Sequence, residues 1–315
     1  SFSTPYFWPL RLMLAVLPQA FNVSPKSDEN VSLSGQLILI TGSNRGIGLE
    51  TAKGLARLGA DLIITARSEE SGKRAANEIL SDLQMREKKN VTITNLQLDL
   101  SDLSSVINLV SEVKKLFPQR RLDQLIQNAG YWPSEFSVSK QGHEIAFATN
   151  VLGPHLLLRK LLKDDVLKQD AKVIVLHGDL YISLQWTQNE DCTVDFKYSG
   201  KSGTQTAYCR SKIGVHWLFN QTLEKFPKLH MNLVHPGVMD NGLVPNGNDI
   251  PKLFLISNEQ GAQTTLICAT SETVNGAYYH NTLGRMILRH DDPVNNPEKQ
   301  RAMWTLVEGL LAKYL

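Results

Sequence analysis

Short runs of apolar residues alternate along the chain with longer segments in which apolar residues recur every three or four positions. From Gln36 onward the apolar runs are four to seven residues long and rich in Ile, Leu and Val. Continuous runs of this length are typical of strands that are buried on both faces of a sheet. We therefore expect strands at 37–41, 61–65, 92–98, 122–127, 172–176, 231–235 and 285–288.

Amphipathic segments lie between most of these runs and predict helices. Their apolar residues fall on one side of a helix, with a period of about 3.6 residues. Strands that alternate with helices indicate an α/β fold, a doubly wound parallel sheet with helices on both faces. No internal repeat or linker divides residues 35–315, which indicates a single domain. The expected helices are 47–58, 71–83, 103–117, 145–162, 207–226 and 297–314.

The first 34 residues stand outside this alternation. Residues 6–17 (YFWPLRLMLAVL) are strongly apolar, but Pro9 and Arg11 interrupt them. A helix that crosses a bilayer needs about 20 apolar residues, so this segment is too short, and no cleavage site of a secretory signal stands out. We expect residues 1–34 to form an arm that packs on the body of the protein or on a second subunit of a homo-oligomer. The alternative is a peripheral contact with a membrane surface.

Composition and charge argue against several other classes of protein. Lys and Arg total 33 against 31 Asp and Glu, a net charge of +2, so nothing favours binding to nucleic acid. The three cysteines are too few for a disulfide framework, and their odd number fits a reducing, cytoplasmic location. The sequence contains neither a CxxC nor an HExxH motif, and we expect no metal site.

A glycine-rich turn, TGSNRGIG at residues 41–48, joins the first expected strand to the first expected helix. Glycines there permit a tight turn and a close approach of the backbone to a pyrophosphate. The start of the helix supplies free N–H groups and the positive end of its dipole. Glycines are common in loops, but the strand–turn–helix context is the one that phosphate binding requires.

The turn resembles the TGxxxGxG signature of the short-chain dehydrogenases/reductases. The same family pattern continues through Asp99, the NAG triplet at 128–130, Asn150, YCRSK at 208–212 and PG at 236–237. The YCRSK, HPGV and C-terminal DP…W sequences are similar to those of retinol-dehydrogenase-like members. The resemblance covers roughly residues 36–290 and implies a Rossmann-type fold with a dinucleotide cofactor.

The second expected strand indicates which dinucleotide is bound. In Rossmann-type folds an acidic residue at the end of this strand holds the ribose of NAD. Here the strand ends with Ala66 and Arg67, without a carboxylate, and Arg45 lies in the glycine-rich turn. Two guanidinium groups suit bidentate recognition of the 2′-phosphate of NADP (NADPH), which is therefore the predicted cofactor. From the turn, these arginines and the family resemblance we expect cofactor contacts from Gly42, Ser43, Asn44, Arg45, Gly46, Ile47, Gly48, Arg67, Asp99, Leu100, Asn128, Ala129, Gly130, Tyr208, Lys212, Pro236 and Gly237.

Tyr208 and Lys212 are four residues apart on an expected helix and therefore share one face. A free phenol has a pKa of about 10, and a nearby ammonium favours the phenolate and lowers that pKa. The resemblance implies that Tyr208 is the general acid/base, that Lys212 also binds the nicotinamide ribose, and that Asn150 holds a water molecule.

The sequence departs from the family pattern at the end of the fifth expected strand. Relatives carry a Ser-Ser pair there and use the second Ser in catalysis, whereas this chain has His177 and Gly178. His177 would replace the missing donor, or Ser183 would fold back toward the gap; the sequence does not decide between them.

Two functions follow from these observations. The first is an NADP(H)-dependent oxidoreductase that interconverts an apolar alcohol and its ketone or aldehyde through Tyr208, Lys212 and Asn150. An apolar segment at 242–258 would cover that substrate, and a polar stretch at 185–205 would form a flap beside it. The second is an NADP-binding pseudoenzyme or cofactor sensor, with little turnover because Gly178 replaces the catalytic Ser.

Overall fold

The computed structural model describes residues 2–3, 17, 19, 25–86, 91–183, 197–239, 242–243 and 252–315. Its strands are β1 (Phe2–Ser3), β2 (Leu37–Ile40), β3 (Asp61–Ala66), β4 (Ile93–Gln97), β5 (Leu122–Gln127), β6 (Leu167–Leu176), β7 (His230–His235), β8 (Tyr278–His280) and β9 (Gly284–Ile287). Its α-helices are α2 (Gly46–Arg57), α3 (Glu69–Met85), α4 (Leu103–Leu116), α5 (Ile145–Phe147), α6 (Gly153–Lys163), α7 (Gly200–Lys225), α8 (Asn258–Thr270) and α9 (Pro297–Leu311). The shorter turns are the π-helix η2 (Ala148–Leu152) and the 3₁₀ helices η3 (Asp179–Ser183), η4 (Lys252–Phe254) and η5 (Pro293–Asn295).

Within these residues the strands form one sheet in the order β1-β9-β8-β7-β6-β5-β2-β3-β4. Neighbouring strands are parallel except β8 and β9. The chain proceeds from β2 to β3 on one side, while β5 pairs with the other side of β2. In doubly wound sheets, ligands bind beyond the carboxyl ends of the strands at such a change of direction.

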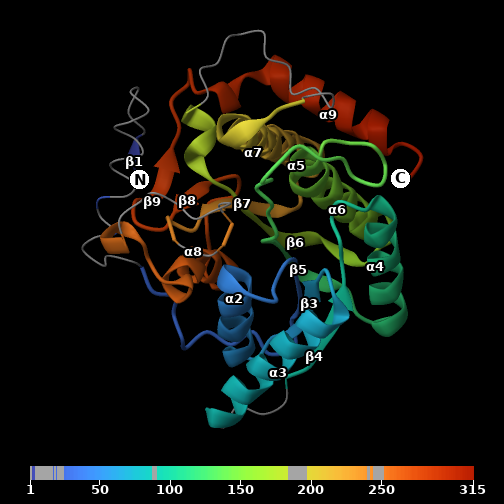
Figure 1. Ribbon diagram of the computed structural model, residues 1–315. Helices are drawn as coiled ribbons and strands as arrows, with labels where there is room; N and C mark the ends of the chain where they lie inside the picture. Colours follow the sequence, from blue (N-terminus) through green and yellow to red (C-terminus); the bar gives the residue numbers. More distant parts are fainter. Residues whose placement is uncertain are drawn as a thin grey trace.

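Apolar side chains on both faces of the sheet explain why its strands show no polar alternation. In β2, Leu37 and Leu39 belong to one core, together with residues of α4, α6 and α7. Ile38 and Ile40 belong to a second core, together with residues of α2, α3 and α8. Figure 1 shows these two helical layers on opposite sides of the sheet. The doubly wound Rossmann-type α/β fold expected from the sequence is therefore confirmed.

Several elements differ from the expectation in ways that have physical causes. The antiparallel pair β8 and β9 includes a strand of three residues, which is too short to give a periodic pattern, and helix α8 was not predicted either. Helix α7 begins at Gly200 rather than at residue 207, because the fold buries Thr204 within a polar segment. The single helix expected at 145–162 is interrupted by the π-helix η2.

The described part of the N-terminal segment contacts the body of the protein. Phe2 and Ser3 pair in parallel with Met286 and Ile287 at the edge of the sheet. No helix among the described residues is both long and apolar enough to cross a membrane. Residues 4–16 lie outside the described part of the chain, so a contact of this arm with a membrane or a second subunit stays a prediction.

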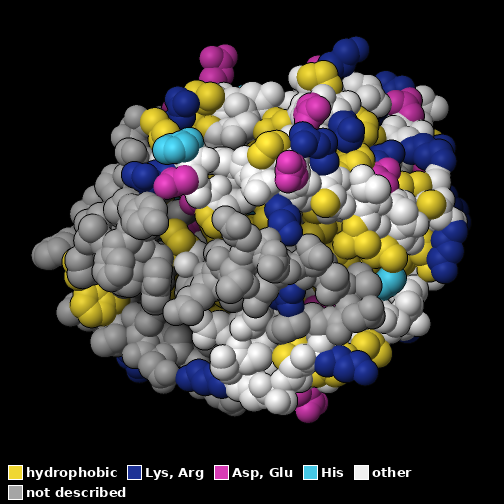
Figure 2. All heavy atoms as spheres, turned by 90° about the horizontal axis from the view of Figure 1, so that it is seen from above, with side chains coloured by type: hydrophobic (Ala, Val, Ile, Leu, Met, Phe, Trp, Pro, Cys, Tyr) yellow, Lys and Arg dark blue, Asp and Glu magenta, His cyan; other side chains and the backbone are white. Residues whose placement is uncertain are grey.

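Charged side chains are mixed on the face shown in Figure 2. Lys and Arg alternate there with Asp and Glu among the coloured residues. This mixture agrees with the net charge of +2.

Gly153 tests the packing of α6 against the loop after β4. A methyl group on Gly153 would overlap the main-chain carbonyl oxygen of Leu100. Gly153→Ala should therefore lower the free energy of unfolding by about 1–3 kcal/mol, as overpacking does. Gly309→Ala is the matched control on α9, because nothing lies within 4 Å of its added methyl group. There the higher helix propensity of Ala should raise the free energy of unfolding by up to about 1 kcal/mol. Urea titration compares the two variants, and equal effects would contradict this packing.

Candidate active site

Side chains of the glycine-rich turn fasten it to the neighbouring strands. The Ser43 hydroxyl donates to Ile40 O (3.0 Å) and accepts from Thr65 N (3.0 Å). Thr41 Oγ1 accepts a hydrogen bond from Ala129 N (3.0 Å). Gly42 has a φ of +64°, and a methyl group there would lie 2.9 Å from Ala129 Cβ. Both the backbone and the close approach therefore require glycine at this position.

The first turn of α2 has the properties of an anion site. Its N-cap residue, Arg45, makes no side-chain capping bond, whereas Ser68 and Asp102 cap the starts of α3 and α4. The N–H groups at the start of α2 therefore lack the side-chain acceptor that those helices have. A methyl group on Gly48 would overlap Gly42 O, so this glycine lets the helix approach the turn closely. The turn fits the pyrophosphate of a dinucleotide.

The loop after β5 is held against this turn. The Asn128 amide donates to Thr41 O (2.8 Å) and to Gly42 O (2.9 Å). The amide of the preceding residue, Gln127, donates to Pro154 O (2.9 Å). Gly130 is exposed, and a methyl group there would lie 3.8 Å from Lys212 Nζ. This loop connects the turn to the helix that carries Lys212.

The two arginines that predicted NADP are both exposed. Arg67 directly follows β3, and Arg45 precedes α2. Across the described residues, no carboxylate forms an ion pair with either guanidinium. Both side chains are thus available to a phosphate.

Three further expected contacts lie on loops at the same edge. One carboxylate oxygen of Asp99 accepts from Ser101 N (2.9 Å) and Ser101 Oγ (2.7 Å), which fixes the loop after β4. Leu100 is buried beneath α6. Gly237, in the loop after β7, has a φ of +90° and donates its N–H to His235 Nδ1 (3.0 Å).

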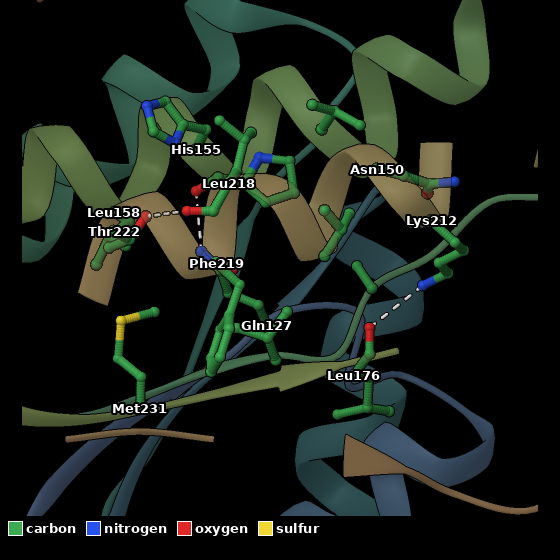
Figure 3. A pocket seen from close by; sticks show the side chains of 15 residues that line it. Gln127, Asn150, His155, Leu158, Leu176, Lys212, Leu218, Phe219, Thr222 and Met231 are labelled. Carbon is green, nitrogen blue, oxygen red and sulfur yellow. Dashed lines mark hydrogen bonds between the residues drawn. The ribbon is translucent and has the colours of Figure 1, made fainter. Parts of the chain in front are cut away.

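Tyr208 and Lys212 lie together on α7, and both are buried. The Tyr208 ring stacks on Trp132, with a centroid separation of 4.4 Å. Lys212 Nζ lies 5.6 Å from the centre of that ring and donates to Leu176 O (3.2 Å), a bond drawn in Figure 3.

Burial dominates the electrostatics of this pair. It lowers the pKa of Lys212 to about 8, because a charged ammonium is poorly solvated inside the protein. It raises the pKa of Tyr208, with a smaller contribution from Cys209. The sequence led us to expect a lowered Tyr208 pKa; in this structure the loss of solvation raises that pKa instead.

Asn150 supports the pair from the π-helix η2. Its amide group donates to Tyr131 O (2.8 Å) and Ser211 Oγ (2.8 Å) and accepts from Tyr131 N (2.8 Å). Ser211 in turn donates to Tyr208 O (2.6 Å). The Asn150 side chain thus joins the loop after β5 to the segment of α7 that carries Tyr208.

The end of β6 places Gly178, not His177, beside Tyr208. A methyl group on Gly178 would lie 3.6 Å from the Tyr208 hydroxyl. His177 Nε2 lies 3.3 Å from His216 Nδ1, and the other ring nitrogen of His177, Nδ1, is also buried. Burial lowers the pKa of the His177 ring. Neither ring nitrogen therefore opens onto the space beside Tyr208, and the interpretation of His177 as the substitute donor is wrong. The side chain of Ser183 lies outside the described residues.

The expected cover and flap are described only in part. Residues 184–196 and 244–251 lie outside the described residues, whereas 200–205 belong to α7 and 252–254 form η4. A cavity of about 40 Å³ lies between the sheet and helices α6 and α7, and Figure 3 shows the side chains that line it.

Gln19 is a residue at this edge that the sequence did not suggest. It is 2% exposed, and its amide accepts from Val238 N (2.8 Å) and donates to Val238 O (3.1 Å) and Phe254 O (2.6 Å). These bonds link the N-terminal segment to the loop after β7 and to η4. A single glutamine in an apolar segment carries no sequence signal for such a contact.

Known proteins are similar to this chain in sequence and in fold. The family model for short chain dehydrogenase matches residues 36–177. Retinol dehydrogenase 12 of Bos taurus is 33% identical over 262 residues, which cover 79% of this chain and 79% of that protein. The WW domain-containing oxidoreductase of Gallus gallus is 32% identical over 303 residues, 90% of this chain and 70% of that protein. The chain therefore belongs to the short-chain dehydrogenase/reductase family of NAD(P)-dependent oxidoreductases, and it resembles the retinol-dehydrogenase-like members.

A solved structure shares the same fold. The alcohol dehydrogenase from the archaeon Thermococcus sibiricus, complexed with 5-hydroxy-NADP, superimposes with a TM-score of 0.59. The match covers 81% of this chain and 95% of that one, at 22% identity. At this identity the likeness extends to the fold alone.

The buried lysine should make stability depend on pH. The pKa of Lys212 falls from 10.5 to about 8 on folding, so between these values the unfolded chain binds more protons than the folded protein. The lysine's contribution to the free energy of unfolding therefore rises across this window and is constant below it. A shift from 10.5 to about 8 corresponds to about 3 kcal/mol. As the pH rises from about 8 to 10.5, the free energy of unfolding of Lys212→Met should thus fall by about 3 kcal/mol relative to that of the parent.

Chemical denaturation at several pH values measures this difference. Lys115→Met removes an exposed lysine of α4 and is the control, for which the difference should stay constant. A constant difference for Lys212→Met as well would show that the ammonium is solvated.

Proposed function

We propose that the protein is an NADP(H)-dependent oxidoreductase that interconverts an apolar alcohol and its ketone or aldehyde. The observation that carries this proposal is the buried Tyr208–Lys212 pair beside Gly130, next to the turn that fits a pyrophosphate. An acid/base group beside a nicotinamide site is the arrangement that carbonyl reduction needs.

Each residue of the site has a separate task in this proposal. When bound, the nicotinamide supplies or accepts the hydride. Tyr208 transfers a proton to or from the substrate oxygen, and stacking on Trp132 fixes the plane of its ring. Lys212 is charged below about pH 8 and then favours the phenolate, which opposes the effect of burial on the Tyr208 pKa. Asn150 holds Tyr131 and Ser211 in place around the pair.

Arg45 and Arg67 support NADP rather than NAD. They would hold the 2′-phosphate, while Ala66 at the end of β3 leaves that strand without a carboxylate to bind the ribose. The solved Thermococcus sibiricus enzyme, whose fold this chain shares, is complexed with 5-hydroxy-NADP.

The similarity to retinol dehydrogenases supports an apolar alcohol or carbonyl compound as substrate. The apolar residues expected to cover the site favour the same chemistry.

A cofactor sensor with little turnover is the second candidate function. Gly178 favours it, because this residue offers no hydroxyl at the position where relatives carry the catalytic Ser. The intact group of Tyr208, Lys212 and Asn150 favours the enzyme.

Cofactor preference can be tested at Arg67. The parent should bind NADPH more tightly than NADH by about 10–100-fold, since charge-assisted hydrogen bonds contribute about 1.5–3 kcal/mol. Arg67→Asp replaces attraction of the 2′-phosphate by repulsion and should reverse that order. Arg74→Asp, at an exposed position on α3, changes the net charge equally and should keep the preference. Fluorescence titration with both cofactors measures the ratio; equal affinities in the parent would refute the assignment.

Tyr208→Phe removes one hydroxyl and keeps the ring that stacks on Trp132. Folding and NADPH affinity should survive, whereas turnover should fall about 10²–10⁴-fold, the contribution of a general acid/base group. Steady-state rates are compared with those of Tyr314→Phe, a remote control near the C-terminus. An unchanged rate in Tyr208→Phe would exclude the proposed chemistry. A parent that binds NADPH but turns over none of a panel of apolar aldehydes, ketones and alcohols would favour the sensor.

A further inference from the structure

Gly178 leaves an open space beside the hydroxyl of Tyr208. Apart from its neighbours in the chain, the one atom of the described residues within 4 Å of a methyl group built on Gly178 is Tyr208 Oη, at 3.6 Å. The φ of Gly178 is not among the positive values that favour glycine. Neither the backbone nor the packing of the described residues requires a glycine here, which leaves room among them for part of a substrate.

Three described polar side chains around Tyr208 are committed elsewhere. The Asn150 amide bonds to Tyr131 and Ser211. Lys212 donates to the main chain of Leu176, and both nitrogens of the His177 ring are buried. Tyr208 is therefore the one described side chain of this group placed to donate to a substrate oxygen.

A second donor is needed for efficient reduction of a carbonyl group. Negative charge develops on the carbonyl oxygen, and a donor aimed at that charge is worth about 10²–10³ in rate. Since the protein offers no hydroxyl at Gly178, the substrate itself is a source of the second donor.

We propose that the substrate is a carbonyl compound with a hydroxyl group on its β carbon, and that this hydroxyl lies in the space at Gly178. The inference rests on the function proposed above and names its substrate class. A hydrogen bond from a β-hydroxyl to the carbonyl oxygen closes a six-membered ring, so the hydroxyl reaches the developing charge within its own molecule. The hydroxyl thereby replaces the side chain that Gly178 lacks, and the remainder of the substrate is apolar.

The reaction balances with the reductant of the proposed function. A hydride from NADPH forms the new C–H bond at the carbonyl carbon, and the π electrons of the C=O bond move to the oxygen. Tyr208 donates the proton to that oxygen and is reprotonated from solvent. The β-hydroxyl donates a hydrogen bond and keeps its own proton. The products are a 1,3-diol and NADP⁺.

Three matched substrates test this assignment: a β-hydroxy ketone with an alkyl chain, the same ketone without the hydroxyl, and the O-methyl ether of the hydroxy ketone. We expect the parent to prefer the hydroxy ketone over the plain ketone by about 10²-fold in kcat/KM. The ether, which has similar bulk but no donor, should give no such advantage.

Two substitutions at Gly178 distinguish the effect of a hydrogen-bond donor from the effect of steric bulk. Gly178→Ser supplies the donor from the protein, so the plain ketone should gain about 10²-fold and the preference for the hydroxy ketone should disappear. Gly178→Ala fills the space without a donor, so the hydroxy ketone should lose its advantage while the plain ketone gains nothing. Differences in intrinsic reactivity cancel, because each preference is compared between variants. In calorimetry, the NADP-loaded parent should bind the 1,3-diol more tightly than the matching simple alcohol, and Gly178→Ala should remove that difference.

NADPH affinity and melting temperature show whether each variant is folded. Turnover of the plain ketone by the parent without any preference for the hydroxyl would overturn this inference and leave the proposed function standing. So would an ether turned over as well as the hydroxy ketone, since bulk alone would then fill the space. Absence of turnover with all three substrates in the parent and in Gly178→Ser, with NADPH bound, would overturn the proposed function together with the inference.

Discussion

The side-chain amide of Asn128 donates to two main-chain oxygens, Thr41 O and Gly42 O, and so holds the loop after β5 against the end of β2. The two strands are parallel neighbours in the sheet, but the chain continues from β2 to β3 on one side and from β5 to β6 on the other. Gly42 and Gly48 have no side chains because Ala129, Asn128 and the turn itself occupy that space. In the loop after β5, a methyl group on Gly130 would lie 3.8 Å from Lys212 Nζ. The hydrogen bonds of Asn128 fix the glycine-rich turn and the loop after β5 relative to each other.

Function and stability are opposed in the Tyr208–Lys212 pair. Burial of Lys212 lowers its pKa to about 8, so below that pH the fold holds a charged ammonium with one main-chain acceptor. The surrounding core must compensate for this loss of solvation. The same burial raises the pKa of Tyr208, which keeps the phenol protonated and able to donate. A lysine close to its titration point beside a protonated phenol suits a site that passes a proton to a carbonyl oxygen.

His177 and Gly178, the two residues that follow β6, lie in different environments. His177 packs among His216, Tyr181 and Tyr278. Gly178, one residue later, has the Tyr208 hydroxyl as its one close neighbour among the described residues that are distant in the chain. The sequence change at this pair therefore extends the buried aromatic cluster on one side and opens the candidate active site on the other.

The sequence by itself determined the fold class, most strands and the order of the site motifs, because continuous apolar runs and glycine turns are local properties of the chain. It did not predict β8 or the start of α7, where three residues or a polar segment are ordered by contacts with distant elements. Nor did it show that His177 lies in the core and Gly178 beside Tyr208, because this depends on how the chain after β6 is oriented relative to α7. Gln19 shows the same limit, since its partners lie 219 and 235 residues away. Tertiary structure decided these points, because hydrogen bonding and burial of single side chains depend on groups that only folding brings together.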